Sequence, residues 1–210
     1  MLPINFAPKN QFQDFDYKAI VHPLAHEHAE VYVFLTCPVN FENKPIIQIF
    51  ENLFFKYGGI LYDKLRDELG LVYGISSDFD HSLQVVQIYL TCEIEYVEQI
   101  IGEVEQVFGD FDKIFIPKKF TEFKNIITKK TDISRDSLKS EINFATESLT
   151  TFGIIENYEN YSKRLQAVTV EQMKEFYTQI AMNLKNKKVV VVSKNPKIVE
   201  IETRMKNQEK

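Results

Sequence analysis

Two side chains that could together hold a peptide, Arg66 and Tyr73, lie on either side of a glycine turn. The segment that contains them predicts a glycine stop, a short amphipathic helix, a second glycine turn at Gly70 and a strand. A reversal of this kind can bring a guanidinium and a phenol together, where they could clamp peptide carbonyls or a carboxylate. An Arg near a helix C-terminus also complements the helix dipole, and a Tyr early in a strand is a common packing residue. Spacing alone leaves both interpretations open.

The histidines do not form the pattern that a zinc peptidase needs. That chemistry requires two histidines one helical turn apart and a glutamate base between them, and His-x-x-Glu-His occurs nowhere in the chain. His22 and His26 have the outer spacing, but Ala25 stands at the position of the base and Pro23 breaks the helix. His26 and His28 could bind a metal from alternate positions of a strand. A polar edge or loop before the strand at residue 29 is the interpretation we prefer.

Composition limits the possible partners. The 210 residues contain 25 Lys and Arg against 30 Asp and Glu, a formal net charge of −5. Because duplex nucleic acid is bound by a basic face, this balance argues against a nucleic-acid-binding protein. No stretch approaches the roughly 18 continuous apolar residues of a membrane span. Residues 1–10 lack the charged start and apolar middle of a signal peptide, so the sequence predicts a cytoplasmic protein if Met1 is its natural start.

The remaining reactive side chains give weaker signals. Cys37 and Cys92 each end an apolar alternating run, so we expect two buried thiols and a reducing compartment rather than a disulfide framework. Ser76 and Ser77 are not part of a nucleophile elbow, and the chain has no glycine-rich phosphate loop. None of these patterns indicates a second active site.

The hydrophobic periods predict an alternation of strands and helices. A period of two over residues 29–37 predicts a strand, and because both of its faces are largely apolar, both are expected to be covered. Thr169 and Gln172 have the spacing of a capping box at the start of a late helix. The expected strands are a possible one at 17–22, then 29–37, 71–77, 84–92 and 189–193; the expected helices begin at Pro45 and cover 60–68, 94–108, 117–152 with a restart near 132–134, and a segment from 169.

This order predicts an α+β fold, with helices packed on one face of a mainly antiparallel sheet. Residues 71–77 and 84–92 are joined by a polar loop over 78–82, which fits an antiparallel hairpin. We expect a single domain over residues 29–193, preceded by a leader or linker and a possible first strand over 1–28 and followed by a charged tail over 194–210.

The nine residues LRDELGLVY at 65–73 resemble the Leu-Arg-Glu-x-x-Gly-Leu-x-Tyr signature of the pitrilysin/insulinase family of zinc metallopeptidases, the inverzincins. The surroundings are similar too. An alternating strand and a helix precede the double glycine at 58–59, the strand Tyr-Gly-Ile-Ser-Ser follows, and a late Thr-Val-Glu-Gln-Met helix leads to Val-Val-Val-Val. The similarity covers residues 29–193, nearly one whole family domain.

Members of this family pair homologous domains, fused or as separate subunits, around a chamber. One domain binds zinc, and the other has lost the metal site and contributes an Arg and a Tyr. The resemblance implies that this chain is the C-terminal, non-catalytic domain or subunit of a processing-peptidase-like enzyme, with no cofactor of its own and with zinc in its partner. Arg66 and Tyr73 match the pair, and the roles implied for them are to anchor substrate carbonyls and to help stabilise the tetrahedral oxyanion.

The same resemblance implies a homologous zinc-bearing partner, with which the chain forms a heterodimer, and a peptide or unfolded-protein substrate that adds as a strand at a sheet edge. Two other functions stay open at this stage. The chain could be a structural or assembly protein on the same fold, with no proteolytic role. It could also be a stand-alone metal hydrolase that uses His22, His26 and His28.

Overall fold

A five-stranded sheet forms the centre of the protein, whose structure is a computed structural model describing residues 16–208. The strands are β1 (Tyr17–Val21), β2 (Ala29–Thr36), β3 (Val72–Asp80), β4 (Val85–Cys92) and β5 (Lys188–Ser193), in the spatial order β1-β5-β2-β4-β3. β1 pairs with β5 in parallel, and the other three pairings are antiparallel. The prediction of a mainly antiparallel sheet is therefore confirmed.

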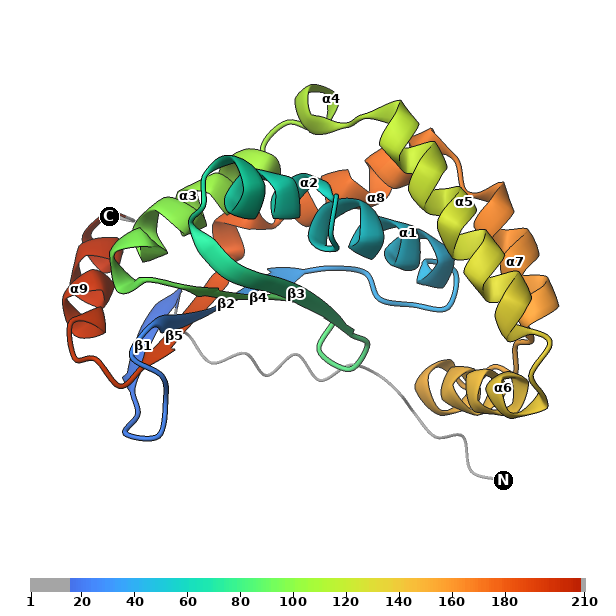
Figure 1. The fold of residues 1–210 in the computed structure, drawn as a ribbon, viewed down its shortest axis with the longest axis horizontal. Coiled ribbons are helices and arrows are strands. Elements are labelled where there is room, and N and C mark those ends of the chain that lie inside the picture. The colour runs from blue at the N-terminus through green and yellow to red at the C-terminus, as the bar shows by residue number, and fades with distance from the viewer. Residues whose placement is uncertain (1–15, 209–210) are drawn as a thin grey trace.

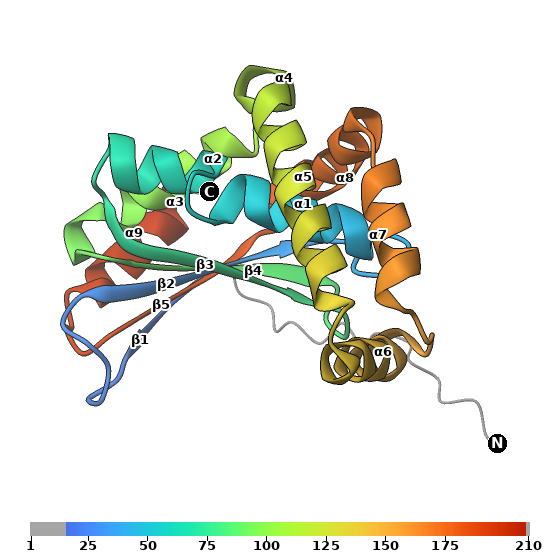
Figure 2. The same ribbon diagram turned by 45° about the vertical axis from the view of Figure 1, so that its right-hand side comes forward.

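Helices cover one face of this sheet. Figure 1 shows α1, α2, α3 and α8 above the strands, and none of the described helices lies under the middle of the lower face. Figure 2 shows α5 and α7 side by side at one end of the molecule, with α6 below them. The α+β fold with helices on one face is thus confirmed. The helices are α1 (Lys44–Phe55), α2 (Ile60–Tyr62), η1 (Asp63–Glu68), η2 (Ile94–Tyr96), α3 (Val97–Val107), α4 (Phe111–Ile114), α5 (Pro117–Ser134), α6 (Leu138–Phe152), α7 (Tyr158–Ala167), α8 (Val170–Met182), η3 (Leu184–Asn186) and α9 (Ile198–Gln208).

The alternation of β2 decides which face is buried. Val31, Val33 and Leu35 are fully buried beneath the helices, as expected for one face of a period-two strand. Tyr32 and Phe34 point to the other face and are only half-buried. The described helices over the sheet all pack on the side of Val31, Val33 and Leu35, so the expectation that both faces of this strand are covered stays a prediction.

Cap residues set several helix boundaries that periodicity alone leaves open. The capping box predicted at Thr169 and Gln172 is present at the start of α8. The predicted long helix over 117–152 is divided into α5 and α6, and the hydroxyl of Ser137 accepts a hydrogen bond from the Ser140 N–H to begin the second. Helix α7, which the hydrophobic pattern did not predict, begins at the cap Asn157.

The two ends of the described chain meet at β1. The possible first strand is present as β1, and the leader expected over residues 1–15 lies outside the described residues. The segment expected as a charged tail forms α9, whose Ile198, Ile201 and Met205 are buried. The Glu202 carboxylate accepts a hydrogen bond from the Ala19 N–H at 3.1 Å. Apolar residues spaced by three and four thus attach this helix to the sheet.

No helix in the described part of the chain combines the length and the apolar character needed to cross a membrane.

Candidate functional site

Arg66 lies on a π-helical turn. Leu61 and Leu65 are fully buried and attach α2 and η1 to the core, so the opposite side of the turn faces solvent. The Leu69 N–H donates to the Lys64 carbonyl five residues earlier at 3.2 Å, which is the π-helical pattern. Single π turns occur frequently at functional sites. The Arg66 side chain is exposed, and its guanidinium lies 5.8 Å from the centre of the Tyr62 ring.

Tyr73 is the extra residue of a β-bulge. Val72 pairs with Cys92 and Gly74 pairs with the next residue, Thr91, so Tyr73 has no partner in the ladder. A bulge of this kind bends the strand and re-aims one side chain, and bulges are over-represented next to active sites. The Tyr73 side chain is 56% exposed and lies near the start of β3, the edge strand. The bulge therefore presents the phenol to solvent at one end of the sheet.

The phenol of Tyr73 has two neighbours that the motif did not indicate. Its O–H donates a short hydrogen bond to the Glu93 carboxylate, and its ring lies edge-on to His28 with the ring centres 5.8 Å apart. The hydrogen bond to Glu93 raises the pKa of Tyr73. The phenol therefore stays protonated at neutral pH and keeps a proton with which it can donate a hydrogen bond.

Arg66 and Tyr73 do not bond to each other. Within residues 16–208, no hydrogen bond or ring contact joins them, and the Arg66 guanidinium has no hydrogen-bonding partner at all. The hypothesis that the turn brings the two side chains together is therefore not supported by a direct contact. Both are exposed around the same Gly70 turn, which has a φ of +63° that favours glycine. The guanidinium N–H donors of Arg66 are thus open to a ligand from outside, and the Tyr73 phenol can donate to one when it releases Glu93.

The histidines lie in the connection between β1 and β2. Residues 22–25 form a turn closed by a hydrogen bond from the Ala25 N–H to the His22 carbonyl at 3.0 Å, so no helix unites His22 and His26. The rings of His26 and His28 stack with centres 4.8 Å apart. In the part of the chain that the structure describes, no three His, Cys, Asp or Glu side chains gather as metal ligands would. This geometry agrees with the preferred interpretation of a polar loop.

The two edges of the sheet differ in their availability. At β1, the outward N–H of Ala19 is already occupied by the carboxylate of Glu202 from α9. At the other edge, β3 pairs only with β4 in the described chain, and its outer main-chain groups are left without a strand partner. Unpaired N–H and C=O groups of an edge strand are a template for another extended chain. Within residues 16–208, β3 is therefore the edge strand whose outer main-chain groups are left open to an added strand.

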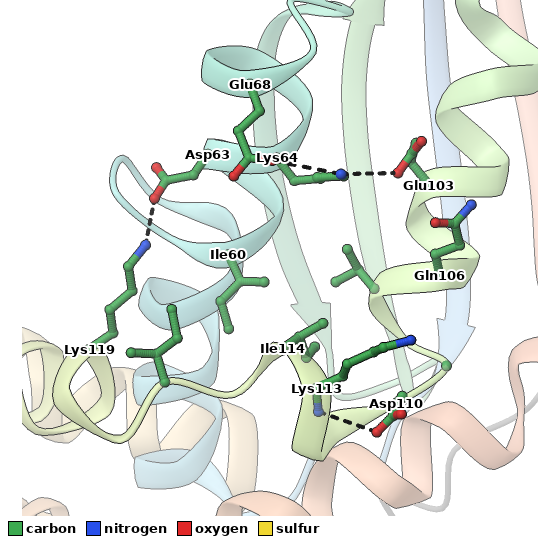
Figure 3. A pocket seen from close by; sticks show the side chains of 13 residues that line it. Ile60, Asp63, Lys64, Glu68, Glu103, Gln106, Asp110, Lys113, Ile114 and Lys119 are labelled. Carbon is green, nitrogen blue, oxygen red and sulfur yellow. Dashed lines mark hydrogen bonds and ion pairs between the residues drawn. The ribbon is translucent and has the colours of Figure 1, made fainter.

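A cavity of about 480 Å³ lies on another side of the same short helix (Figure 3). Its charged side chains mostly satisfy one another. Lys119 contacts Asp63 at 2.5 Å, and Lys64 lies 4.0 Å from Glu103. The described residues that line it include no Ser, Cys, His or Tyr, so the cavity contains no nucleophile with an imidazole base. The exposed side of the turn, rather than this cavity, is the better candidate site.

The sequence did not predict Glu93 or His28 as neighbours of Tyr73. Glu93 follows the last residue of β4 and His28 precedes the first residue of β2, and these two strand ends are aligned by the pairing of Ala29 with Cys92. Only the strand register brings them to the bulge. A signal for the bulge itself was present in the sequence, because the apolar residues of β3 change phase after Val72.

Comparisons with known proteins give one family and one fold. The profile of the family described as "Peptidase M16 inactive domain" matches residues 6–127. Among solved structures, the chain is similar to a peptidase M16 inactive domain from Pseudomonas fluorescens, with 18% identity and a TM-score of 0.69 over 84% of this chain and 43% of that one. It is also similar to the inactive peptidase domain of a putative zinc protease from Bordetella parapertussis, with 9% identity and a TM-score of 0.63 over 82% of this chain and 96% of that one.

A third similar structure is the periplasmic protease PqqL from Escherichia coli, with 18% identity and a TM-score of 0.68 over 86% of this chain and 21% of that one. At these identities the likeness shows the fold alone. The chain spans about two-fifths of the first two solved chains, at 41% and 43% of their lengths. Sequence comparison with curated proteins gives no match.

Proposed function

Because the chain belongs to the peptidase M16 inactive-domain family, we propose that it is the non-catalytic, substrate-gripping part of a two-part zinc endopeptidase. The resemblance to the pitrilysin/insulinase peptidases that the sequence indicated is thereby confirmed, while the role in gripping substrate is our proposal. One observation supports it most. An unpaired guanidinium, that of Arg66, and the protonated phenol of Tyr73 flank the start of the free edge strand β3.

In this proposal the substrate pairs with β3 as an added strand. Main-chain hydrogen bonds to the edge provide binding without sequence preference. Arg66 donates to substrate carbonyl oxygens near the scissile bond, and it suits this role because its planar fork offers several donors. Tyr73 donates its O–H to the developing oxyanion, after releasing Glu93. Both residues act by donating hydrogen bonds, which stabilise charge electrostatically, and neither transfers a proton to the substrate.

The hydrolytic centre then belongs to the partner. A zinc ion held by a homologous domain or subunit would supply the activated water, and this chain would supply shape and donors. A heterodimer with such a partner is therefore part of the proposal, and so is a peptide or unfolded protein as substrate. We also retain the cytoplasm as the predicted location, since Cys37 and Cys92 are both free thiols, as expected in a reducing compartment.

Reconstitution tests the proposal. The chain is mixed with a zinc-bearing homologue from the same organism, and cleavage of an unfolded protein is followed by mass spectrometry. We expect no cleavage by the chain alone and cleavage by the pair. Arg66→Ala should lower the kcat of the pair roughly 10²-fold, in the range for loss of one oxyanion donor. The matched control is Arg135→Ala, which removes another exposed Arg from the far end of α5.

The outcomes separate the rival functions. A stable complex that cleaves at the same rate with Arg66→Ala as with Arg135→Ala would remove the proposed role of Arg66. A stable complex without any cleavage, with each zinc-bearing homologue, would favour a structural or assembly protein. Cleavage by the chain alone that is lost with His26→Ala would instead revive the stand-alone metal hydrolase.

A further inference from the structure

The face of the sheet that no described helix covers, which we call the open face, consists of cross-strand rows of side chains. In antiparallel and parallel pairs alike, residues that are directly paired project to the same face. Because Val31 and Val33 point toward the helices, the residues that alternate with them define the open face. Read from the free edge inward, the rows are Gly74, Thr91, Glu30, Val192 and Ile20; then Ser76, Tyr89, Tyr32, Val190 and Lys18; then Asp78, Gln87, Phe34 and Lys188.

The side chains of the middle row change abruptly in size from the edge strand to the next. It begins at the edge with the small side chain of Ser76, and the next two positions are the half-buried rings of Tyr89 and Tyr32, with centres 5.0 Å apart. The neighbouring edge position is Gly74, which has no side chain; a Cβ there would meet nothing closer than Thr91 at 3.5 Å. The small side chains over β3 are thus bordered on their inner side by two aromatic rings; we call this strip the trough and the two rings its wall.

A hydrogen bond to Glu30 fixes the inner of the two tyrosine rings. The Tyr32 hydroxyl donates to the Glu30 carboxylate at 3.0 Å, which fixes the inner ring. Burial, and then this hydrogen bond, raises the pKa of Tyr32 to about 12, so the ring stays neutral at all ordinary pH values. The hydroxyl of Tyr89 has no hydrogen-bonding partner within residues 16–208.

A peptide added to β3 would place one side chain directly above this trough. Adjacent strands lie about 4.8 Å apart, so a residue paired opposite Ser76 is about 10 Å from the row position of Tyr89. A Phe, Tyr or Met side chain laid over Ser76 spans more than half of that distance and meets the ring, which extends from the other side. A short polar side chain does not reach it. Ser76 is the third residue after Tyr73, so this contact lies about 10 Å along the strand from the phenol.

We propose that Gly74, Ser76, Tyr89 and Tyr32 form a side-chain subsite on the open face of the sheet, which selects a large apolar or aromatic residue of an extended peptide paired with β3. This inference rests on the proposed function and adds a substrate class to it, namely unfolded segments that have an aromatic or long aliphatic residue at one position. The subsite lies two to three residues from the bond that Tyr73 addresses.

Nuclear magnetic resonance titration of the isolated chain tests the subsite, because it measures weak binding and locates it. Two otherwise identical ten-residue peptides are compared, built from Thr and Ser with terminal Lys for solubility. One has Phe at the central position and the other has Ser. We expect amide shifts along β3 with both peptides, and roughly tenfold tighter binding of the Phe peptide.

Three variants sharpen the result. Ser76→Phe fills the trough from an exposed position, and Tyr89→Ala removes the wall. Each should bring the affinity for the Phe peptide down to that for the Ser peptide, while the Ser peptide binds as before. Ile20→Ala is the control, because it removes apolar surface from the same face at the opposite edge of the sheet. It should leave the preference unchanged. Circular dichroism establishes that each variant is folded.

The titrations distinguish failure of the subsite from failure of the proposed gripping function. Equal affinity for the two peptides, with shifts along β3, would overturn the subsite and leave the gripping function intact. Binding of neither peptide would contradict gripping at β3 and the subsite together. A preference for Phe that survives both Ser76→Phe and Tyr89→Ala would place the selective contact elsewhere and overturn the subsite.

Discussion

Replacing Ile198 by Ala tests whether the C-terminal segment is part of the folded domain or a charged tail. Ile198 is fully buried at the start of α9, where it packs with Ile201 against the sheet. Ile→Ala substitutions in a packed core cost about 2–5 kcal/mol, from the lost burial and the cavity that remains. We expect the free energy of unfolding to fall by about 3 kcal/mol. For a chain of this size that corresponds to a Tm lower by roughly 6–12 °C.

The neighbouring residue provides a matched control. Val199 is 49% exposed on the same helical turn, and Val199→Ala changes β-branching in the same way while removing little buried surface. We expect it to change stability by less than about 0.5 kcal/mol. Because the chain has no Trp, unfolding in urea is best followed by circular dichroism. If Ile198→Ala and Val199→Ala unfold at the same urea concentration, α9 does not contribute to the fold and our account of the β1 edge fails with it.

Two further predictions concern buried polar groups. Arg164→Ala should cost about 3 kcal/mol, because it leaves the nearly fully buried carboxylate of Glu156 without its main partner. In urea unfolding, Arg204→Ala, which breaks an exposed pair, should cost less than 1 kcal/mol; equal losses would contradict the difference in burial. Burial, followed by the charge of Glu93, raises the pKa of the folded Cys92 thiol to about 12. In the unfolded chain the same thiol ionises near its ordinary pKa, so at alkaline pH it is charged only when unfolded. Stability should therefore fall as pH rises above about 8.5, and between pH 8.5 and 10 the wild type should lose about 1.5 kcal/mol more than Cys92→Ala. Equal losses in the two proteins would show that Cys92 is not responsible.

The fold could be predicted because its signals are local. The alternation of β2 and the capping box of α8 depend on a few neighbouring residues, and the structure contains both. The breaks in the helical region could not be predicted as well. Ser137 and Asn157 are ordinary polar residues until their side chains are seen to accept N–H groups at the start of a helix. Whether a Ser or Asn caps a helix depends on where the chain turns, which tertiary packing decides.

The candidate site shows the same limit. Arg66 and Tyr73 were indicated by a motif, but their surroundings depend on register. Glu93 is 20 residues from Tyr73, and only the pairing of β3 with β4 brings the two together. The sequence of a strand likewise does not show whether helices will cover one or both of its faces. Tyr32 and Phe34 are apolar enough for a buried face, yet the described helices over the sheet all pack on the other side.

The bulge at Tyr73 connects the hydrophobic pattern to the proposed function. Strict alternation from the buried Val72 would turn Gly74, Ser76 and Asp78 toward the helices. Because an unpaired carboxylate is costly to bury, the sheet instead inserts one extra residue, and Ile75 and Phe79 then pack against the core. The same insertion places the small side chains of β3 on the open face and leaves Tyr73 outside the ladder. Core packing thus requires the irregularity that presents the phenol, and a peptide on the β3 edge would meet both of its consequences.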